Sequence, residues 1–378
     1  MRIINGVLMT ITGRQYQNGY VDFENGKITA YGDASESNAV VDEIYNARGG
    51  YILPGFIDAH THIGVCEEGV RWEGDDCNES TDPVTPQMDV IDGFYPFDIA
   101  IPKAVSGGVT TAVVCPGSTN VICGKIAAIK LRGTCIDDMI LKAPCAMKFA
   151  VGENPKRCYG QSKGHTPSTR MSIASILRDA FTKTKIYMAK KESGEDVYDD
   201  RWEALIPVLK GTLPAHFHAH RSDDILTVIR ICKEFGLRYT LVHATDSVAI
   251  LPYLQKEGGI PIIGPSLGPT SKTESRASSF ANAGILSKAG LEVAITTDHD
   301  VQPLQYLPVF AALCVREGMD VDAALRAITI NPAKIAGIED RVGSIEVGKD
   351  ADICVFSNHP FEFMSKTTAV FIDGIRVK

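Results

Sequence analysis

Short apolar runs alternate with amphipathic stretches along the middle of the chain. The runs that we expect to form strands are 51–57, 109–115, 145–151, 215–219, 239–243, 260–263 and 293–297, with either 126–130 or 139–142 as a further strand. Between them, apolar positions recur at helical spacing, as in the stretch that Ser222 opens as N-cap and Gly236 ends. A second helix is expected to open at Thr166-Pro167. This alternation is typical of parallel βα units and predicts an α/β fold built on a (β/α)8 barrel of the TIM type.

The two ends of the chain show a different pattern of hydrophobic and polar positions. Residues 1–50 read as short strands separated by turns, with Asn25-Gly26 as a strong hairpin signal, and the tail after residue 345 is also rich in short strands. Neither end is long enough to hide its own apolar face. We therefore expect residues 1–50 and 345–378 to form one small composite β-sandwich, and residues 51–344 to form the barrel.

Histidines and one aspartate stand at the ends of several of the apolar runs. His60 and His62 close the first run, and side chains two apart on a strand point to the same side. Further runs end at His216, His218 and His220, at His243 and at Asp298. Parallel barrel strands carry their active site at the carboxyl ends. A carboxylate that closes so apolar a run would be costly to bury without a partner.

The first of these motifs carries a family resemblance. Pro54-Gly55-Phe56-Ile57-Asp58-Ala59-His60-Thr61-His62 resembles the first metal motif of the amidohydrolase superfamily, whose members are metal-dependent hydrolases and deaminases. The stretch 343–352 resembles the return of that family into its terminal β-sandwich. The resemblance covers nearly the whole chain and is closest to the imidazolonepropionase-like and dipeptidase-like branch.

The resemblance implies a set of metal ligands. His60, His62, His243 and Asp298 match its ligand positions, and His218 fits the His-Ala pattern of the fifth strand. His216 and His220 share a strand face with His218, so a slip of two residues stays open; we expect His220 to contact substrate and His216 to be a buried, hydrogen-bonded histidine.

In the family that the chain resembles, a carboxylate or a carboxylated lysine on the fourth strand marks the members that bind two metals. We favour Glu153, just past the strand end, as the ligand there, with a carboxylated Lys148 as the alternative. Because these two positions are an odd number of residues apart, a regular strand cannot aim both of them inward.

The expected chemistry is hydrolysis by metal-activated water. Imidazoles and carboxylates suit Zn²⁺, and Mn²⁺ or iron would also fit; one or two ions are expected. Asp298 is the expected proton shuttle, with His243 as its expected catalytic partner, and either His243 or His220 would stabilise the oxyanion. The substrate would be a cyclic amide, an N-acyl amino acid or a dipeptide. Hydrolytic deamination is the alternative reaction, and a metal-free scaffold is the alternative from another class of protein.

Several residues at the rim are candidates for substrate contact. Ser118 and Asn120 follow the second predicted strand, and Arg157 follows the fourth. The segment 65–98 carries ten acidic residues against one arginine, so it is either a lid that favours a cationic substrate or a solvated loop.

Composition and net charge limit the classes of molecule that the chain is expected to bind. The 44% hydrophobic and 22% charged fractions are those of an ordinary globular protein, and the net charge of −8 argues against nucleic acid, which needs a basic face. No apolar run has the length of a membrane helix, and the N-terminus lacks a secretory signal pattern, so we expect a cytoplasmic protein that does not contact membranes. The ten cysteines show no Cys-x-x-Cys spacing, and we expect free thiols. A small-molecule substrate and a homo-oligomer are expected.

Overall fold

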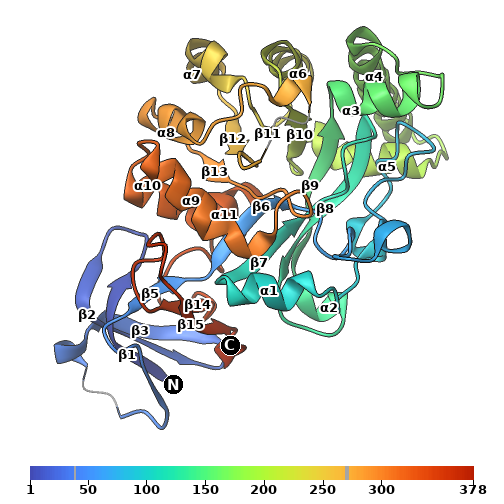
Figure 1. Cartoon of the computed structure of the whole chain (residues 1–378). Coiled ribbons are helices and arrows are strands. Elements are labelled where there is room, and N and C mark those ends of the chain that lie inside the picture. Colours follow the sequence, from blue (N-terminus) through green and yellow to red (C-terminus); the bar gives the residue numbers. More distant parts are fainter. Residues whose placement is uncertain (38–39, 269–271) are drawn as a thin grey trace.

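The computed structural model describes residues 1–37, 40–268 and 272–378, and two sheets organise them (Figure 1). The smaller unit combines both ends of the chain. Its strands are β1 (Arg2–Met9), β2 (Gln15–Glu24), β3 (Lys27–Asp33), β4 (Ile44–Asn46), β5 (Tyr51–Pro54), β14 (Ile353–Phe356), β15 (Thr367–Ile372) and β16 (Ile375–Arg376).

This terminal sheet has the order β16-β15-β14-β5-β1-β2-β3, with β4 on β1. β5 pairs with β1 on one side and with β14 on the other, so N-terminal and C-terminal strands are neighbours. The rings of Phe23 on β2 and Phe371 on β15 lie 5.5 Å apart although their strands are distant in the sheet order. A single hydrogen-bonded sheet therefore curls around one apolar core, which confirms the expectation that the two ends share one β unit.

The larger sheet is the barrel, with eight strands in chain order. They are β6 (Phe56–Thr61), β7 (Val109–Val114), β8 (Ile122–Lys130), β9 (Ile140–Ala150), β10 (Ala215–Ala219), β11 (Tyr239–His243), β12 (Ile260–Ile263) and β13 (Ala294–Ile295). The first and last strands meet through the Thr296 hydroxyl, which donates to the His60 carbonyl at 2.6 Å, and through a backbone bond from His62 to His299.

Two features of the barrel correct the expectations. β8 runs antiparallel to both β7 and β9, so the barrel is not wholly parallel. Of the two candidates for the third strand, 126–130 lies in β8, whereas residues 140–142 of the other candidate form the start of β9. The expected first strand, 51–57, is in fact two strands. Gly55 separates β5, which belongs to the terminal sheet, from β6, which belongs to the barrel. The terminal sheet thus extends beyond the expected boundary at residue 50.

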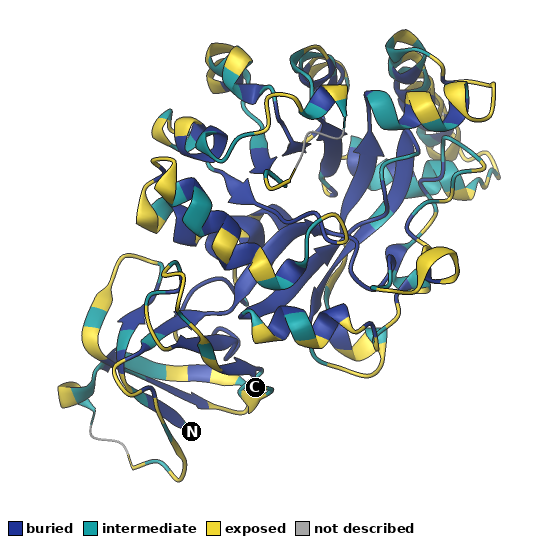
Figure 2. Ribbon diagram, in the orientation of Figure 1, coloured by how far each residue is buried: buried dark blue, intermediate teal, exposed yellow. Residues whose placement is uncertain are grey.

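Helices cover the outside of the barrel, and their outward faces are the exposed ones (Figure 2). They are α1 (Ala100–Ser106), α2 (Ile136–Met139), α3 (Glu153–Lys156), α4 (Arg170–Glu192), α5 (Asp200–Leu209), α6 (Ser222–Phe235), α7 (Leu251–Glu257), α8 (Ala281–Lys288), α9 (Leu307–Arg316), α10 (Val321–Ala327) and α11 (Ile330–Ala336).

The predicted helix ends are partly right. α6 ends at Gly236 in the left-handed conformation, as expected for a glycine C-cap, but its N-cap position is Arg221 and Ser222 is already helical. α4 begins at Arg170, later than Thr166-Pro167, because the Thr169 side chain accepts the N–H of Ser172 and caps the helix there. In the described ranges, every helix is too short or too polar to cross a bilayer.

Candidate metal centre

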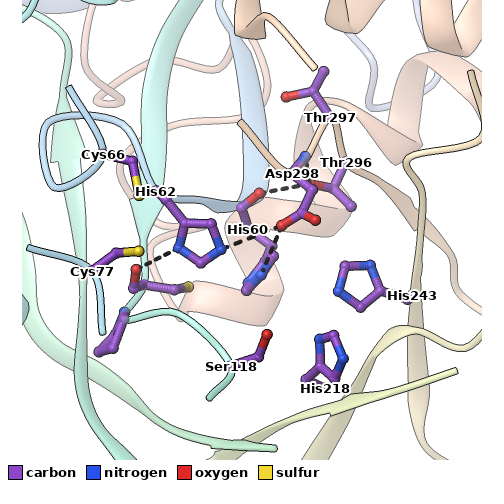
Figure 3. A network of polar contacts seen from close by, with 12 residues as sticks. His60, His62, Cys66, Cys77, Ser118, His218, His243, Thr296, Thr297 and Asp298 are labelled. Atoms are coloured by element: carbon purple, nitrogen blue, oxygen red, sulfur yellow. Dashed lines mark hydrogen bonds and ion pairs between the residues drawn. The ribbon is translucent and has the colours of Figure 1, made fainter. Parts of the chain in front are cut away.

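Four barrel strands bring histidines and one aspartate together at their carboxyl ends. His60 and His62 come from β6, His218 from β10, His243 from β11, and Asp298 follows β13 (Figure 3). All five side chains are buried. The strand ends place them at one mouth of the barrel, which is where active sites of this architecture lie.

The carboxylate of Asp298 has a geometry that fits a metal ion. Its Oδ1 lies 3.3 Å from His60 Nε2 and 3.4 Å from His62 Nε2, yet within residues 1–37, 40–268 and 272–378 this buried oxygen has no hydrogen-bond partner of good geometry. Four-coordinate zinc with bonds of about 2.0–2.2 Å holds neighbouring nitrogen and oxygen donors roughly 3.4 Å apart. The three atoms therefore have the spacing of donors around one cation.

Hydrogen bonds behind the rings orient the histidines. His62 Nδ1 donates to the carbonyl of Cys115 at 2.8 Å, and His243 Nδ1 donates to the carbonyl of Gly264 at 2.6 Å. A carbonyl oxygen only accepts, so each Nδ1 carries the proton and each Nε2 keeps a free lone pair. This is the outer arrangement that metal-binding histidines use.

His218, His220 and His243 form a second group of converging nitrogens. One ring nitrogen from each lies within 4.8 Å of the others, and the rings of His220 and His243 stack with centroids 4.4 Å apart. His220 Nδ1 also lies 2.8 Å from the Thr245 hydroxyl. His216 lies deeper: its Nδ1 is 2.8 Å from the hydroxyl of Thr240 and its Nε2 is 3.3 Å from His60 Nδ1.

The structure does not bring Glu153 to this cluster. Glu153 is the first residue of α3, its side chain is 32% exposed, and its carboxylate lies 3.9 Å from Arg157. Gly152, with a φ of 89°, turns the chain away after β9. Lys148 instead points inward from β9, fully buried, with Nζ 3.3 Å from His60 Nε2 and 3.2 Å from the carbonyl of Pro116. The structure thus places Lys148, the alternative, at the strand-four position.

The electrostatics of the cluster favour metal binding. Burial is the main cause that lowers the pKa of His60, with the Lys148 ammonium second, and burial also lowers the pKa values of His218 and His243. Neutral imidazoles present lone pairs at pH 7. Burial alone would raise the pKa of Asp298, but its interactions with His243, His60 and His62 outweigh burial and lower the pKa well below its usual range. An ionised carboxylate beside imidazole nitrogens is a donor set that suits a divalent cation.

The cluster opens into a cavity of about 490 Å³. Ser118 lines it, as expected of a substrate-contacting residue, together with His62, His218, His220 and Asp298. Asn120 does not line it: this side chain is buried and donates to the carbonyl of Glu79 and to Thr85. Arg157 is 53% exposed, lies outside the cavity and, among the described residues, forms an ion pair with Glu153 alone.

Three polar residues near the cavity had no signal in the sequence. Asn154 donates to Ser118 at 2.8 Å, and Lys272 donates to Asn154 Oδ1 at 2.8 Å; both line the cavity. Glu274 is buried, and its unpartnered Oε1 lies 4.0 Å from His218 Nε2 and 3.9 Å from His220 Nε2. Asn154 lies in the short helix α3, four residues past the end of β9, and Lys272 and Glu274 lie between β12 and α8, so no strand or helix periodicity marks these positions as inward.

Known proteins resemble the chain over its length. The model of the amidohydrolase family matches residues 208–377. An amidohydrolase from Thermotoga maritima MSB8 has a solved structure that is 42% identical, with a TM-score of 0.96 over 100% of this chain and 99% of that one. The imidazolonepropionase of Symbiobacterium thermophilum is 34% identical over 90% of this chain and 84% of its own length.

A further relative is much longer. Amidohydrolase tasK of Hapsidospora irregularis is 30% identical over 94% of this chain, which spans 39% of the length of that protein. On this fold, this site and these relatives, the chain belongs to the amidohydrolase family.

Proposed function

We propose that this protein hydrolyses a carbon–nitrogen bond of a small molecule with a divalent cation, Zn²⁺ first among the candidates, held by His60, His62, His218, His243 and Asp298. The observation that carries the proposal is the buried, unpartnered Oδ1 of Asp298 at donor spacing from two imidazole nitrogens, at the base of a cavity. Lys148, modified to a carbamate, is the candidate for a bridge to a second cation.

The cation would supply an acidified water and polarise the carbonyl of the substrate. Asp298 is placed to take the proton of the attacking water, because its carboxylate borders the cavity as well as the histidines. The same carboxyl group then returns the proton to the departing nitrogen, so it acts as base and then as acid. His243, fixed by its bond to Gly264, has a ring nitrogen within 4.8 Å of donor atoms of Asp298 and His60.

Among the described residues that line the cavity, Lys272 is cationic and Asp298 and Asp300 are acidic, and we assign to Lys272 the binding of an anionic group of the substrate. None of the ten acids of segment 65–98 is among the described residues that line the cavity; Glu68 pairs with Lys103 at 2.7 Å and Asp82 with Arg201 at 2.8 Å. Lys272 does line it, and in the described part of the chain no carboxylate forms an ion pair with its ammonium. We therefore place a carboxylate of the substrate at Lys272, with the scissile bond at the histidines.

The reaction can be tested with purified protein loaded separately with Zn²⁺ and Mn²⁺. The substrate panel contains dipeptides, N-acyl amino acids and cyclic ureides, each as the carboxylate and as its neutral amide, and released amine is measured for each. Released ammonia is measured separately for the ureides and for amidine substrates. Hydrolysis that depends on added metal and is lost on chelation is the expected result. Absence of turnover across the panel in a metal-loaded protein contradicts the proposal, and ammonia release from an amidine carbon alone would identify a deaminase.

A further inference from the structure

A group of sulfur and oxygen atoms lies beside the histidine cluster, on the segment between β6 and α1. Cys66 is tied to the end of β6 by its backbone N–H, which donates to the carbonyl of His62 at 2.8 Å. Asp75 forms an antiparallel bridge with Cys66, and Cys77 follows and lines the cavity. Figure 3 shows the sulfur atoms of both cysteines on the side of His62 away from His243. All ten cysteines of the chain are free.

We propose that Cys66, Asp75 and Cys77 form a separate site for a thiophilic divalent cation such as Zn²⁺ or Cd²⁺. The Asp75 Oδ1 atom lies 3.7 Å from Cys66 Sγ and 3.3 Å from Cys77 Sγ, and the three donor atoms all lie within 4.8 Å of one another. Tetrahedral zinc with bonds of about 2.3 Å to sulfur and 2.1 Å to oxygen holds such a pair roughly 3.6 Å apart. The observed distances lie on either side of that value.

A hydrogen bond behind the site supports this assignment. The Asn78 amide nitrogen donates to Cys77 Sγ at 3.0 Å, while its Oδ1 accepts the backbone N–H of Thr119 at 3.1 Å. The second contact fixes which end of the amide faces the sulfur, so the sulfur is the acceptor. Outer donors of this kind orient metal ligands and stabilise their charge.

The types of donor atom indicate which cation would bind, and the exposure of the three residues indicates where it would enter the site. Both sulfur atoms belong to buried residues, whereas Asp75 is exposed and opens the site to solvent. Thiolates select soft or borderline cations, and Mg²⁺ and Ca²⁺ prefer oxygen ligands. Binding would release the two thiol protons to the buffer, with no change in oxidation state. Because Cys77 and His62 line the same cavity, an ion there would also stiffen one wall of the hydrolytic site.

The test is a titration of the full chain, reduced and free of metal, with Cd²⁺, followed by the sulfur-to-cadmium charge-transfer absorption. Wild-type protein should give a saturable band that Cys66→Ser and Cys77→Ser each abolish. Asn78→Ala should weaken Cd²⁺ binding by roughly 10–100-fold. Asp298→Asn should keep the band, because the hydrolytic centre contributes no sulfur ligand to it.

Two further cysteines serve as matched controls. Cys115 lies within 4.8 Å of nitrogens of His60 and His216, and Cys135 is exposed, so Cys115→Ser and Cys135→Ser should both retain the band. Alkylation mapping of wild-type protein gives a readout that does not depend on how the variants fold: Cd²⁺ should protect Cys66 and Cys77 together. A band that survives in both Cys66→Ser and Cys77→Ser, a band lost in Cys115→Ser, or no protection of the pair would overturn the proposal.

Discussion

Asp298 meets two demands at once. Its carboxylate is buried among neutral imidazoles, and its backbone adopts the left-handed region with a φ of 53°. Asparagine tolerates that backbone region better than most residues and has nearly the same shape. Asp298→Asn therefore removes the charge and the proton acceptor while it preserves the local fold.

We expect Asp298→Asn to lower kcat by at least about 10³-fold, because loss of a general base costs roughly 10²–10⁴-fold and a weakened metal ligand adds to that loss. The measurement is kcat together with bound metal per chain, on folded protein. In the wild-type plot of activity against pH, the acid limb should report the joint titration of the Asp298 carboxylate and the activated water as a coupled pair. Turnover near wild type in a metal-loaded variant contradicts the proposed role.

Lys272 tests the substrate class. Lys272→Met should raise KM for a carboxylate substrate by roughly 10–100-fold with kcat little changed, since a hydrogen bond to a charged group contributes about 1.5–3 kcal/mol. Lys272→Arg should restore most of the loss, and the neutral amide of the same substrate should not respond. An equal rise in KM for the carboxylate and for the amide would show that Lys272 does not bind the substrate carboxylate. It would leave the proposal of metal-dependent hydrolysis unaffected.

At the level of strands and helices, periodicity predicted that histidine-bearing strand ends meet at one mouth of the barrel, whereas the choice of ligands among them rested on the family resemblance. His60 lies near the end of β6 and His243 ends β11, and their rings lie 5.6 Å apart. The expectation for Glu153 is wrong in geometry because the strand stops at Ala150 and Gly152 turns the chain into α3. Lys272 and Glu274 come from a loop after β12, where tertiary packing alone decides which side chains face inward.

Strand register explains why Lys148 takes the inward position. Lys148 on β9 pairs directly with His216 on β10, so both side chains point to the same face of the barrel. We expect Lys148→Met to lower metal affinity by at least about 10–100-fold, the cost of losing even an indirect contact to a site. Glu153→Gln, one turn beyond the strand, is the matched control and should leave bound metal unchanged. Metal per chain after dialysis measures both, and the reverse pattern would restore Glu153 as the ligand.

The barrel and the terminal sheet are joined by one buried cation. Lys130, at the end of β8, lies 2.8 Å from Asp350 and 3.0 Å from Asp352, and it also pairs with Asp373 after β15. Burial raises the pKa of Asp352 to about 6, whereas for Asp350 the pairing with Lys130 and Lys27 outweighs burial and lowers the pKa. The charge of Lys130 therefore keeps a group of carboxylates ionised between the two units.

Lys130→Met should destabilise the protein by roughly 3–5 kcal/mol at pH 8, because it leaves buried carboxylates without their cation. Without Lys130 the folded-state pKa of Asp352 should rise further above its unfolded value, and the lowering of the Asp350 pKa should be lost. The folded variant then holds more protons than the unfolded chain, so its stability increases as pH falls. Urea unfolding of wild type and variant at pH 8 and pH 5 should show a smaller difference in the free energy of unfolding at pH 5.

The control is Lys103→Met, which breaks the exposed pair with Glu68 and should cost at most about 1 kcal/mol at either pH. An equal loss for Lys130→Met at both pH values would mean that packing of the lysine stem, and not its charge, holds the terminal sheet on the barrel.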